Sequence, residues 1–146
     1  MTDLNLAAFL PYQLSIASNA VSGRIAGQYQ ARFGLKIPEW RIMAVLGEGQ
    51  PMTQRELVGM TRMDKVTVSR ATAVLVDRGL IERAASRSDG RSHHLTLTIA
   101  GRTLYSEIAS VAKAMEQSLL ACLTAAERAQ LSGMLDRLRG AADMAD

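Results

Sequence analysis

Two arginines flank an Asp-Gly pair in the segment 82–98, which reads ERAASRSDGRSHHLTLT. Asp-Gly between two stretches of strand-forming residues predicts a tight hairpin turn, so the pair is expected at a hairpin tip. Arg87 and Arg91 would then point into solvent, where their own fold offers nothing for the charge to bind. This arrangement suits the binding of a polyanion outside the chain.

A second set of groups with suitable chemistry lies in the segment 64–79, DKVTVSRATAVLVDRG. Asp64 is a good N-cap and Gly79 a good helix end, so the segment is predicted to be a helix. At roughly 100° per residue its core side consists of Val68, Ala71, Thr72 and Leu75. The opposite side consists of Val66, Arg70, Ala73 and Asp77, with Thr67 and Ser69 on the flanks.

The outward side of this helix matches what the major groove of DNA accepts. Arg70 can donate two hydrogen bonds to guanine O6 and N7, and Val66 can touch a thymine methyl group. The Thr67 and Ser69 hydroxyls can bond bases or phosphates, and Lys65 at the helix start suits a phosphate. The alternative is an ordinary amphipathic surface helix that exposes one valine. A following hairpin and a local basic excess favour DNA.

The hairpin tip would complete the contact. Arg91 would reach the minor groove, whose narrow A·T stretches attract arginine. Asp89 would hold that guanidinium extended, and Arg87 would lie on a phosphate. The residues predicted to contact DNA are Thr53, Lys65, Val66, Thr67, Ser69, Arg70, Arg87, Asp89 and Arg91.

The elements that position these residues can be read from capping and periodicity. Pro38 and Glu39 suit the start of one short helix, and a Thr53–Glu56 capping box starts a second, ahead of the helix from Asp64. Three short helices with tight breaks predict a helix-turn-helix, and the strands of 80–98 predict a wing. The expected fold is mainly α with a small β-hairpin wing.

Longer helices are predicted on both sides of this module. Apolar residues follow a helical spacing from Leu10 to Phe33 and again from Leu104 to Cys122, and a Thr124–Glu127 capping box starts a last helix. We expect one domain over 1–146, with a winged module at 36–99 and a helical lobe formed by 1–34 and 100–146. The lobe helices are longer than the module needs. Their apolar stripes are covered either by a second copy of the chain or by each other.

Charge and composition narrow the class of protein. The segment from Thr53 to Arg102 contains nine Lys/Arg and five Asp/Glu. The rest of the 146 residues contain eight Lys/Arg and nine Asp/Glu. On charge alone, this basic excess fits a polyanion-binding surface and a solvated face equally well. The N-terminus does not resemble a signal peptide, and no apolar run approaches the roughly 18 residues of a membrane span. We therefore expect a cytoplasmic protein without a membrane segment.

Residue types also argue against other activities. Cys122 is the single cysteine, so no disulfide within the chain is possible. His93 and His94 are adjacent on a predicted strand and point to opposite faces, so they cannot make a two-ligand metal site alone. A zinc-type cluster of Cys and His is absent from the sequence, and no cofactor is implied. We find no nucleophile paired with a base and no phosphate-binding glycine loop, so no enzyme is predicted.

The segments MDKVTVSRATAVLVDRGLIER, SDGR and LTLTIAGRTLY resemble the MarR family of winged helix-turn-helix regulators. The N-terminal segments FLPYQLSIASNAVSGRIA and FGLKIPEWRIMAVL are similar to that family's first two helices. The resemblance implies a homodimeric repressor that binds double-stranded DNA at a pseudo-palindromic operator and is released by a small aromatic or phenolic ligand. The candidate ligand-binding residues are Tyr12, Ile16, Trp40, Met43 and Tyr105, for each of which plain packing is the alternative.

Two further expectations accompany this resemblance. Some members of the family sense peroxide through a cysteine near the N-terminus, but Cys122 lies at the end of the fifth helix and is expected to be a small core residue. The alternative function is a winged-helix module that binds another protein without specific DNA binding. In that case, replacing Arg70 or Arg91 would leave partner binding intact.

Overall fold

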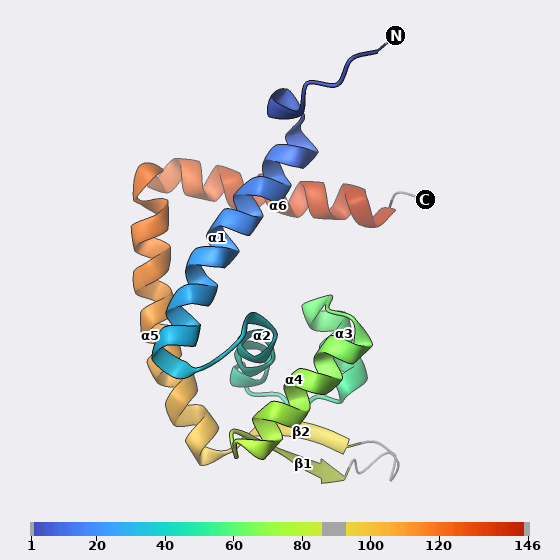
Figure 1. The fold of residues 1–146 in the computed structure, drawn as a ribbon, viewed down its shortest axis with the longest axis vertical. Coiled ribbons are helices and arrows are strands. Elements are labelled where there is room, and N and C mark those ends of the chain that lie inside the picture. The colour runs from blue at the N-terminus through green and yellow to red at the C-terminus, as the bar shows by residue number, and fades with distance from the viewer. Residues whose placement is uncertain (1, 86–92, 145–146) are drawn as a thin grey trace. The chain divides into compact units, whose positions relative to one another are not determined.

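The computed structural model describes residues 2–85 and 93–144 of the 146-residue chain. Its elements, in chain order, are η1 (Leu6–Ala8), α1 (Leu10–Phe33), α2 (Ile37–Gly47), α3 (Gln54–Thr61), α4 (Lys65–Asp77), β1 (Ile81–Ala85), β2 (His93–Leu97), α5 (Ile99–Leu119), η2 (Leu120–Cys122) and α6 (Ala125–Met144) (Figure 1). The predicted fold class, mainly α with one β-hairpin, is confirmed. The predicted hairpin tip, with Arg87, Asp89 and Arg91, lies outside the described residues.

The chain divides into two compact units, Met1–Ser110 and Val111–Asp146. The first unit contains α1 to α4, the hairpin and the first half of α5. The second contains the rest of α5, then η2 and α6. None of the helices in the part of the chain that the structure covers is both long enough and apolar enough to cross a membrane.

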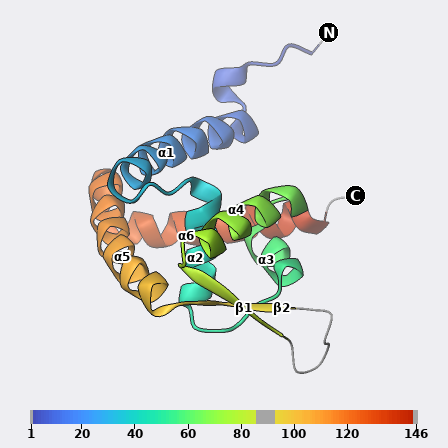
Figure 2. The ribbon, with the colours of Figure 1, turned by 60° about the horizontal axis from the view of Figure 1, so that its bottom comes forward.

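In the first unit, α2, α3 and α4 pack on one another and against the hairpin. Figures 1 and 2 both show these three helices gathered beside the two strands. The strands pair antiparallel, with Ile81 opposite Leu97 and Arg83 opposite Leu95. Leu95 and Leu97 are buried whereas Thr96 between them is half-buried, as alternation along a strand requires. One face of the hairpin therefore closes the helical core.

A single residue before α3 adds a third strand-like contact to this hairpin. Met52 and Leu95 exchange two backbone hydrogen bonds, with N···O distances of 3.2 and 2.7 Å. The bridge fixes the start of α3 against β2. The sequence does not predict it, because one residue shows no alternation.

The predicted helix stop at Gly34, the Thr53 cap and the Thr124–Glu127 capping box are confirmed. Gly34 ends α1 in the left-handed conformation, with φ of 62°, a region that favours glycine. Thr53 caps α3 by accepting the Glu56 N–H at 3.1 Å. At the start of α6, Thr124 N donates to Glu127 Oε1 at 2.9 Å and Glu127 N donates to Thr124 Oγ1 at 3.1 Å, a complete capping box.

The prediction that Cys122 is a core residue is wrong. Its side chain is exposed, in the turn η2 that follows α5. A helical spacing of 100° per residue would place Cys122 on the apolar stripe of α5, whereas the 3₁₀ turn η2 has three residues per turn and so changes the direction of the side chain. The same turn is held to α6 by Arg128, which donates twice to the Leu120 carbonyl, at 3.1 and 2.8 Å.

Candidate nucleic-acid interface

The two sides of α4 differ as the sequence predicts. Its buried residues are Val68, Ala71, Thr72 and Leu75. On the other side Val66, Ser69, Arg70, Ala73 and Asp77 are all exposed, with Val66 retaining 56% of its accessible surface. An exposed valine at the start of a helix gains nothing from its own fold. The outward side is therefore available to a partner.

The first turn of α4 is fixed by Asp64. Its Oδ1 accepts the Thr67 N–H and its Oδ2 accepts the Thr67 hydroxyl, both at 2.8 Å. Because the Thr67 O–H is donated to Asp64, the Thr67 oxygen can offer only an acceptor to a partner. It therefore suits the amino group of a base better than a phosphate.

These two bonds also give Asp64 a pH-dependent role. The Thr67 N–H and then the Thr67 hydroxyl stabilise the ionised carboxylate, which lowers the pKa of Asp64 below its ordinary value. The contribution of this charge to stability is therefore fully present above the unfolded-state pKa of about 3.9. It is lost as the pH falls through the lower folded value.

We expect Asp64→Asn to reveal this dependence, since asparagine can still accept the Thr67 N–H but carries no charge. The free energy of unfolding of the wild type should exceed that of the variant most at about pH 5, and the difference should shrink toward about pH 2. Urea unfolding followed by circular dichroism at several pH values measures it. A difference that stays constant with pH would show that the charge contributes nothing.

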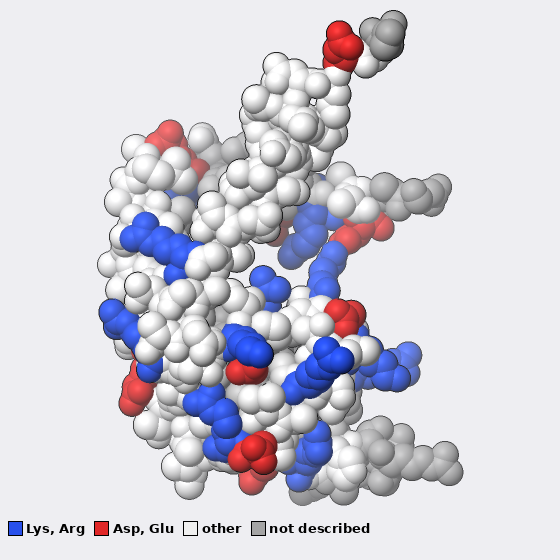
Figure 3. All heavy atoms as spheres, viewed as in Figure 1, with Lys and Arg blue, Asp and Glu red and all other residues white. Residues whose placement is uncertain are grey.

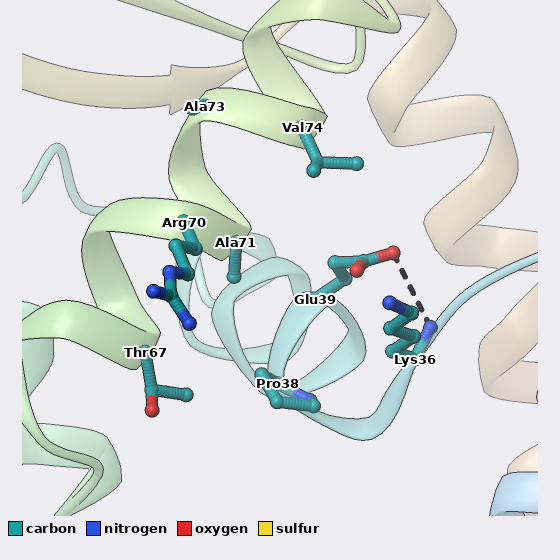
Figure 4. A pocket seen from close by; sticks show the side chains of 8 residues that line it. All are labelled: Lys36, Pro38, Glu39, Thr67, Arg70, Ala71, Ala73 and Val74. Carbon is teal, nitrogen blue, oxygen red and sulfur yellow. Dashed lines mark hydrogen bonds between the residues drawn. The ribbon is translucent and has the colours of Figure 1, made fainter.

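A hollow of about 510 Å³ lies on one side of α4, between this helix and the start of α2. Figure 4 shows Arg70 and Thr67 projecting from α4 and Pro38, Glu39 and Lys36 coming from α2 and the residue before it. Glu39 is buried, and its Oε1 accepts the Lys36 N–H at 3.2 Å. The Arg70 guanidinium thus borders an open hollow rather than packing inside the fold.

A second hollow, of about 640 Å³, lies where the start of α3 meets the hairpin. Its lining residues are Thr53, Gln54, Arg55, Lys65, Arg83, His93 and Leu95. Three of these residues are lysine or arginine, and they come from three separate elements. Figure 3 shows Lys and Arg side chains spread over the face of the molecule that it draws, with acidic side chains between them.

The structure therefore brings together most of the described residues predicted to contact DNA. Thr53 and Lys65 line the second hollow, Thr67 and Arg70 line the first, and both Val66 and Ser69 are exposed on α4. Sequence reasoning missed the other basic residues of the two hollows, Lys36, Arg55, Arg83 and His93. The excess of Lys and Arg between Thr53 and Arg102 was the available signal for Arg55 and Arg83.

The predicted ligand-binding residues are only partly assembled. The Trp40 and Tyr105 rings stack, with centroids 6.3 Å apart and planes at 20°, and Tyr29 meets Trp40 edge-on at 5.1 Å. Met43 is fully buried in the core. Tyr12 lies 17 residues before Tyr29 on the same helix, which is about 25 Å at 1.5 Å per residue. Within one chain, Tyr12 and its neighbour Ile16 are therefore remote from this aromatic cluster.

Three helices, the third exposing polar and basic groups, and a hairpin that closes their core define the winged helix-turn-helix class of proteins. A sequence model of the MarR family matches residues 33–92. The chain is 31% identical over 105 residues to the HTH-type transcriptional repressor Rv2887 of Mycobacterium tuberculosis H37Rv, covering 72% of this chain and 76% of the relative. The chain therefore belongs to the MarR family of transcriptional regulators.

Solved structures agree with this assignment. A MarR/EmrR family transcriptional regulator from Acinetobacter sp. ADP1 superposes with a TM-score of 0.89 at 27% identity, over 97% of this chain and all of the other. The MarR family transcriptional regulator SPO1453 from Silicibacter pomeroyi DSS-3 gives a TM-score of 0.78 at 31% identity, over 93% of this chain and 99% of the other. The fold is thus shared across nearly the whole chain.

Proposed function

We propose that this regulator is a homodimeric repressor that reads a pseudo-palindromic DNA operator. The observation that carries the proposal is the exposed side of α4, with Val66, Ser69 and Arg70. Arg70 and Lys36 border one hollow beside this helix, together with Glu39 and apolar residues, and Arg55, Lys65 and Arg83 line the other. A helix inserted in the major groove has a phosphate backbone on each side. Cations beside both flanks of a reading helix match that charge pattern.

Selection from random duplex DNA tests the proposal. The recovered sequences are expected to share an inverted repeat whose half-sites lie about one helical turn apart. Fluorescence polarisation should then show affinity falling steeply with salt, because phosphate contacts release counterions. Recovery of no common sequence, with equal affinity for scrambled DNA at every salt concentration, would reject sequence-specific binding and favour a winged module that binds protein.

The homodimer is supported by apolar surface on the long helices. In α1 the side chains of Leu10, Tyr12, Leu14, Ile16 and Val21 are exposed. In α6, within the second unit, Leu131, Met134, Leu135 and Leu138 are exposed as well. Two helices with such apolar stripes need a partner surface, and a second copy with two-fold symmetry is the simplest. Sedimentation equilibrium measures the stoichiometry.

We propose repression rather than activation because the mycobacterial relative Rv2887 is a transcriptional repressor.

A small aromatic or phenolic acid is the proposed effector, with the half-buried Trp40 and Tyr105 rings as its binding wall. Tyr12 and Ile16 would join this wall only from a second copy of the chain. Trp40 is the single tryptophan, so its fluorescence reports on this wall alone. Titration with substituted benzoic acids is expected to quench Trp40 and to release operator DNA over the same concentration range. Release of DNA without a change in Trp40 would place the effector elsewhere.

A further inference from the structure

The corner where α4 ends and β1 begins, Arg78–Leu80, contacts both of the long helices of the first unit. Arg78 Nη1 donates to the Gly34 carbonyl at 3.2 Å, and Arg78 Nη2 donates to the Phe33 carbonyl at 3.1 Å. These carbonyls lie at the end of α1, 44 and 45 positions earlier in the chain. One guanidinium therefore ties the end of α4 to the end of α1.

The end of α1 is well suited to receive this group. The last carbonyls of a helix lack partners within it and carry the negative end of the helix dipole. The Gly34 N–H bonds the Gln30 carbonyl at 3.1 Å and the Leu35 N–H bonds the Tyr29 carbonyl at 3.3 Å, so the backbone N–H groups that follow α1 turn back to earlier carbonyls. The Phe33 and Gly34 carbonyls accept from Arg78 instead. The planar fork of arginine reaches two acceptors at once, which a lysine cannot do with the same geometry.

The first turn of α5 is attached to the same corner. The Thr98 hydroxyl donates to the Gly79 carbonyl at 2.6 Å, and the Thr98 N–H donates to the Leu80 carbonyl at 3.0 Å. Thr98 Oγ1 also accepts the Gly101 N–H at 3.0 Å, which caps α5. The corner is thus held on one side by α1 and on the other by α5.

This corner forms one end of the helix that reads DNA. The Arg78 N–H bonds the Val74 carbonyl at 2.9 Å, so its backbone continues the hydrogen bonding of α4. Arg70 lies eight residues earlier, about 12 Å along the axis. A small change in the angle at Arg78 therefore moves the side chains that meet the bases.

We propose that Arg78 is a positioning residue that sets the orientation of α4 against α1 and, in the dimer, the separation and angle of the two reading helices. It would thereby determine which half-site spacing the protein accepts. This inference rests on the proposed function, since it requires a dimer that reads two half-sites. It assigns to Arg78 selectivity for spacing, with no contact to DNA.

The physical consequence is discrimination between operators that differ only in length. One inserted base pair moves a half-site by about 3.4 Å along the duplex and rotates it by about 35°. A rigidly mounted pair of helices can follow that change only by deforming the DNA, which we expect to cost about tenfold in affinity. A loosely mounted pair adjusts at little cost.

The test compares the wild type with Arg78→Lys and Arg78→Gln on operators recovered with the wild-type protein, and on versions lengthened or shortened at the centre by one base pair. Arg78 is exposed, so its bonds contribute little to stability and both variants are expected to fold. Arg32→Lys is the matched control. Arg32 lies in the last turn of α1, and its Nε donates to Gln28 Oε1 of the same helix, at 3.2 Å.

For the wild type and for Arg32→Lys, we expect a change of one base pair in spacing to lower the affinity about tenfold. For both Arg78 variants, we expect the same change to lower the affinity by no more than about threefold. Circular dichroism and sedimentation confirm folding and the dimer. Arg78 variants that keep the wild-type penalty would overturn the inference, as would a uniform loss of affinity at every spacing. Failure of the wild type to select any inverted repeat would instead reject the proposed function on which the inference depends.

Discussion

Arg70→Ala is expected to weaken operator binding by about 1–3 kcal/mol, roughly 5- to 150-fold in the dissociation constant, without lowering the melting temperature. The side chain is exposed on α4 and borders the hollow next to α2, so its removal leaves no cavity in the core. If its fork pairs with guanine, the loss falls on one base pair in each half-site. Substituting that guanine should then cost the variant little, whereas it costs the wild type the full amount.

The control for Arg70→Ala is Arg32→Ala, which removes the same charge from the same unit outside α3, α4 and the hairpin. Measuring both variants by polarisation on the full set of single-base operator substitutions separates base reading from general electrostatics. Equal weakening on every sequence, with a shallower salt dependence, would identify Arg70 as a phosphate contact. Equal losses of operator affinity in Arg70→Ala and Arg32→Ala would show that α4 does not contact the DNA.

The burial pattern of α4 shows why its buried and exposed sides could be predicted from the sequence. The sides of an isolated helix follow from 3.6 residues per turn, so Val68, Ala71, Thr72 and Leu75 could be assigned to the core and Arg70 to solvent without knowing what they pack against. Helix ends are equally local, because a cap such as Asp64 acts within three residues. The predicted helices, hairpin and fold class follow from signals of this kind.

The rest of the candidate site depends on contacts that no local pattern records. The hollow beside the hairpin joins Arg55, Lys65 and Arg83 from three elements, and only their packing brings the charges together. The bonds from Arg78 to α1 span 44 and 45 positions. Nothing in the sequence distinguishes an arginine that bonds a distant helix, such as Arg78, from one that contacts only water.

The wrong prediction for Cys122 and the distance of Tyr12 from Trp40 both arise because periodicity describes only one helix at a time. Periodicity tells which side of a helix a residue occupies, but not where the helix stops or what lies opposite. The apolar spacing of α5 continues in the sequence past Leu119, where the α-helix ends and a 3₁₀ turn of different pitch begins. The family resemblance grouped Tyr12 with Trp40, although one chain of this length and helix geometry keeps them apart.

The largest effect on stability is expected from Gly101→Ala, which should lower the free energy of unfolding by about 2–4 kcal/mol. Gly101 is buried in the first turn of α5, directly against the corner that ends α4. A methyl group there would overlap the Leu80 carbonyl oxygen and lie 3.0 Å from the Leu80 carbonyl carbon and 3.3 Å from Leu97 Cδ2. The obstacle is backbone, so no rotation of a side chain relieves it.

Relief of this overlap requires α5 to move away from Leu80, and that movement would lengthen the 3.0 Å bond from Thr98 N to the same carbonyl. Gly59→Ala is the matched control: Gly59 lies in α3, and a methyl group there meets nothing within 4 Å. That variant should gain up to about 1 kcal/mol, because alanine restricts the unfolded chain and favours a helix. Urea unfolding at one protein concentration compares all three proteins. A Gly101→Ala protein within about 0.5 kcal/mol of the wild type would mean that α5 can leave the corner at little cost, and that the first turn of α5 does not hold α4 in place.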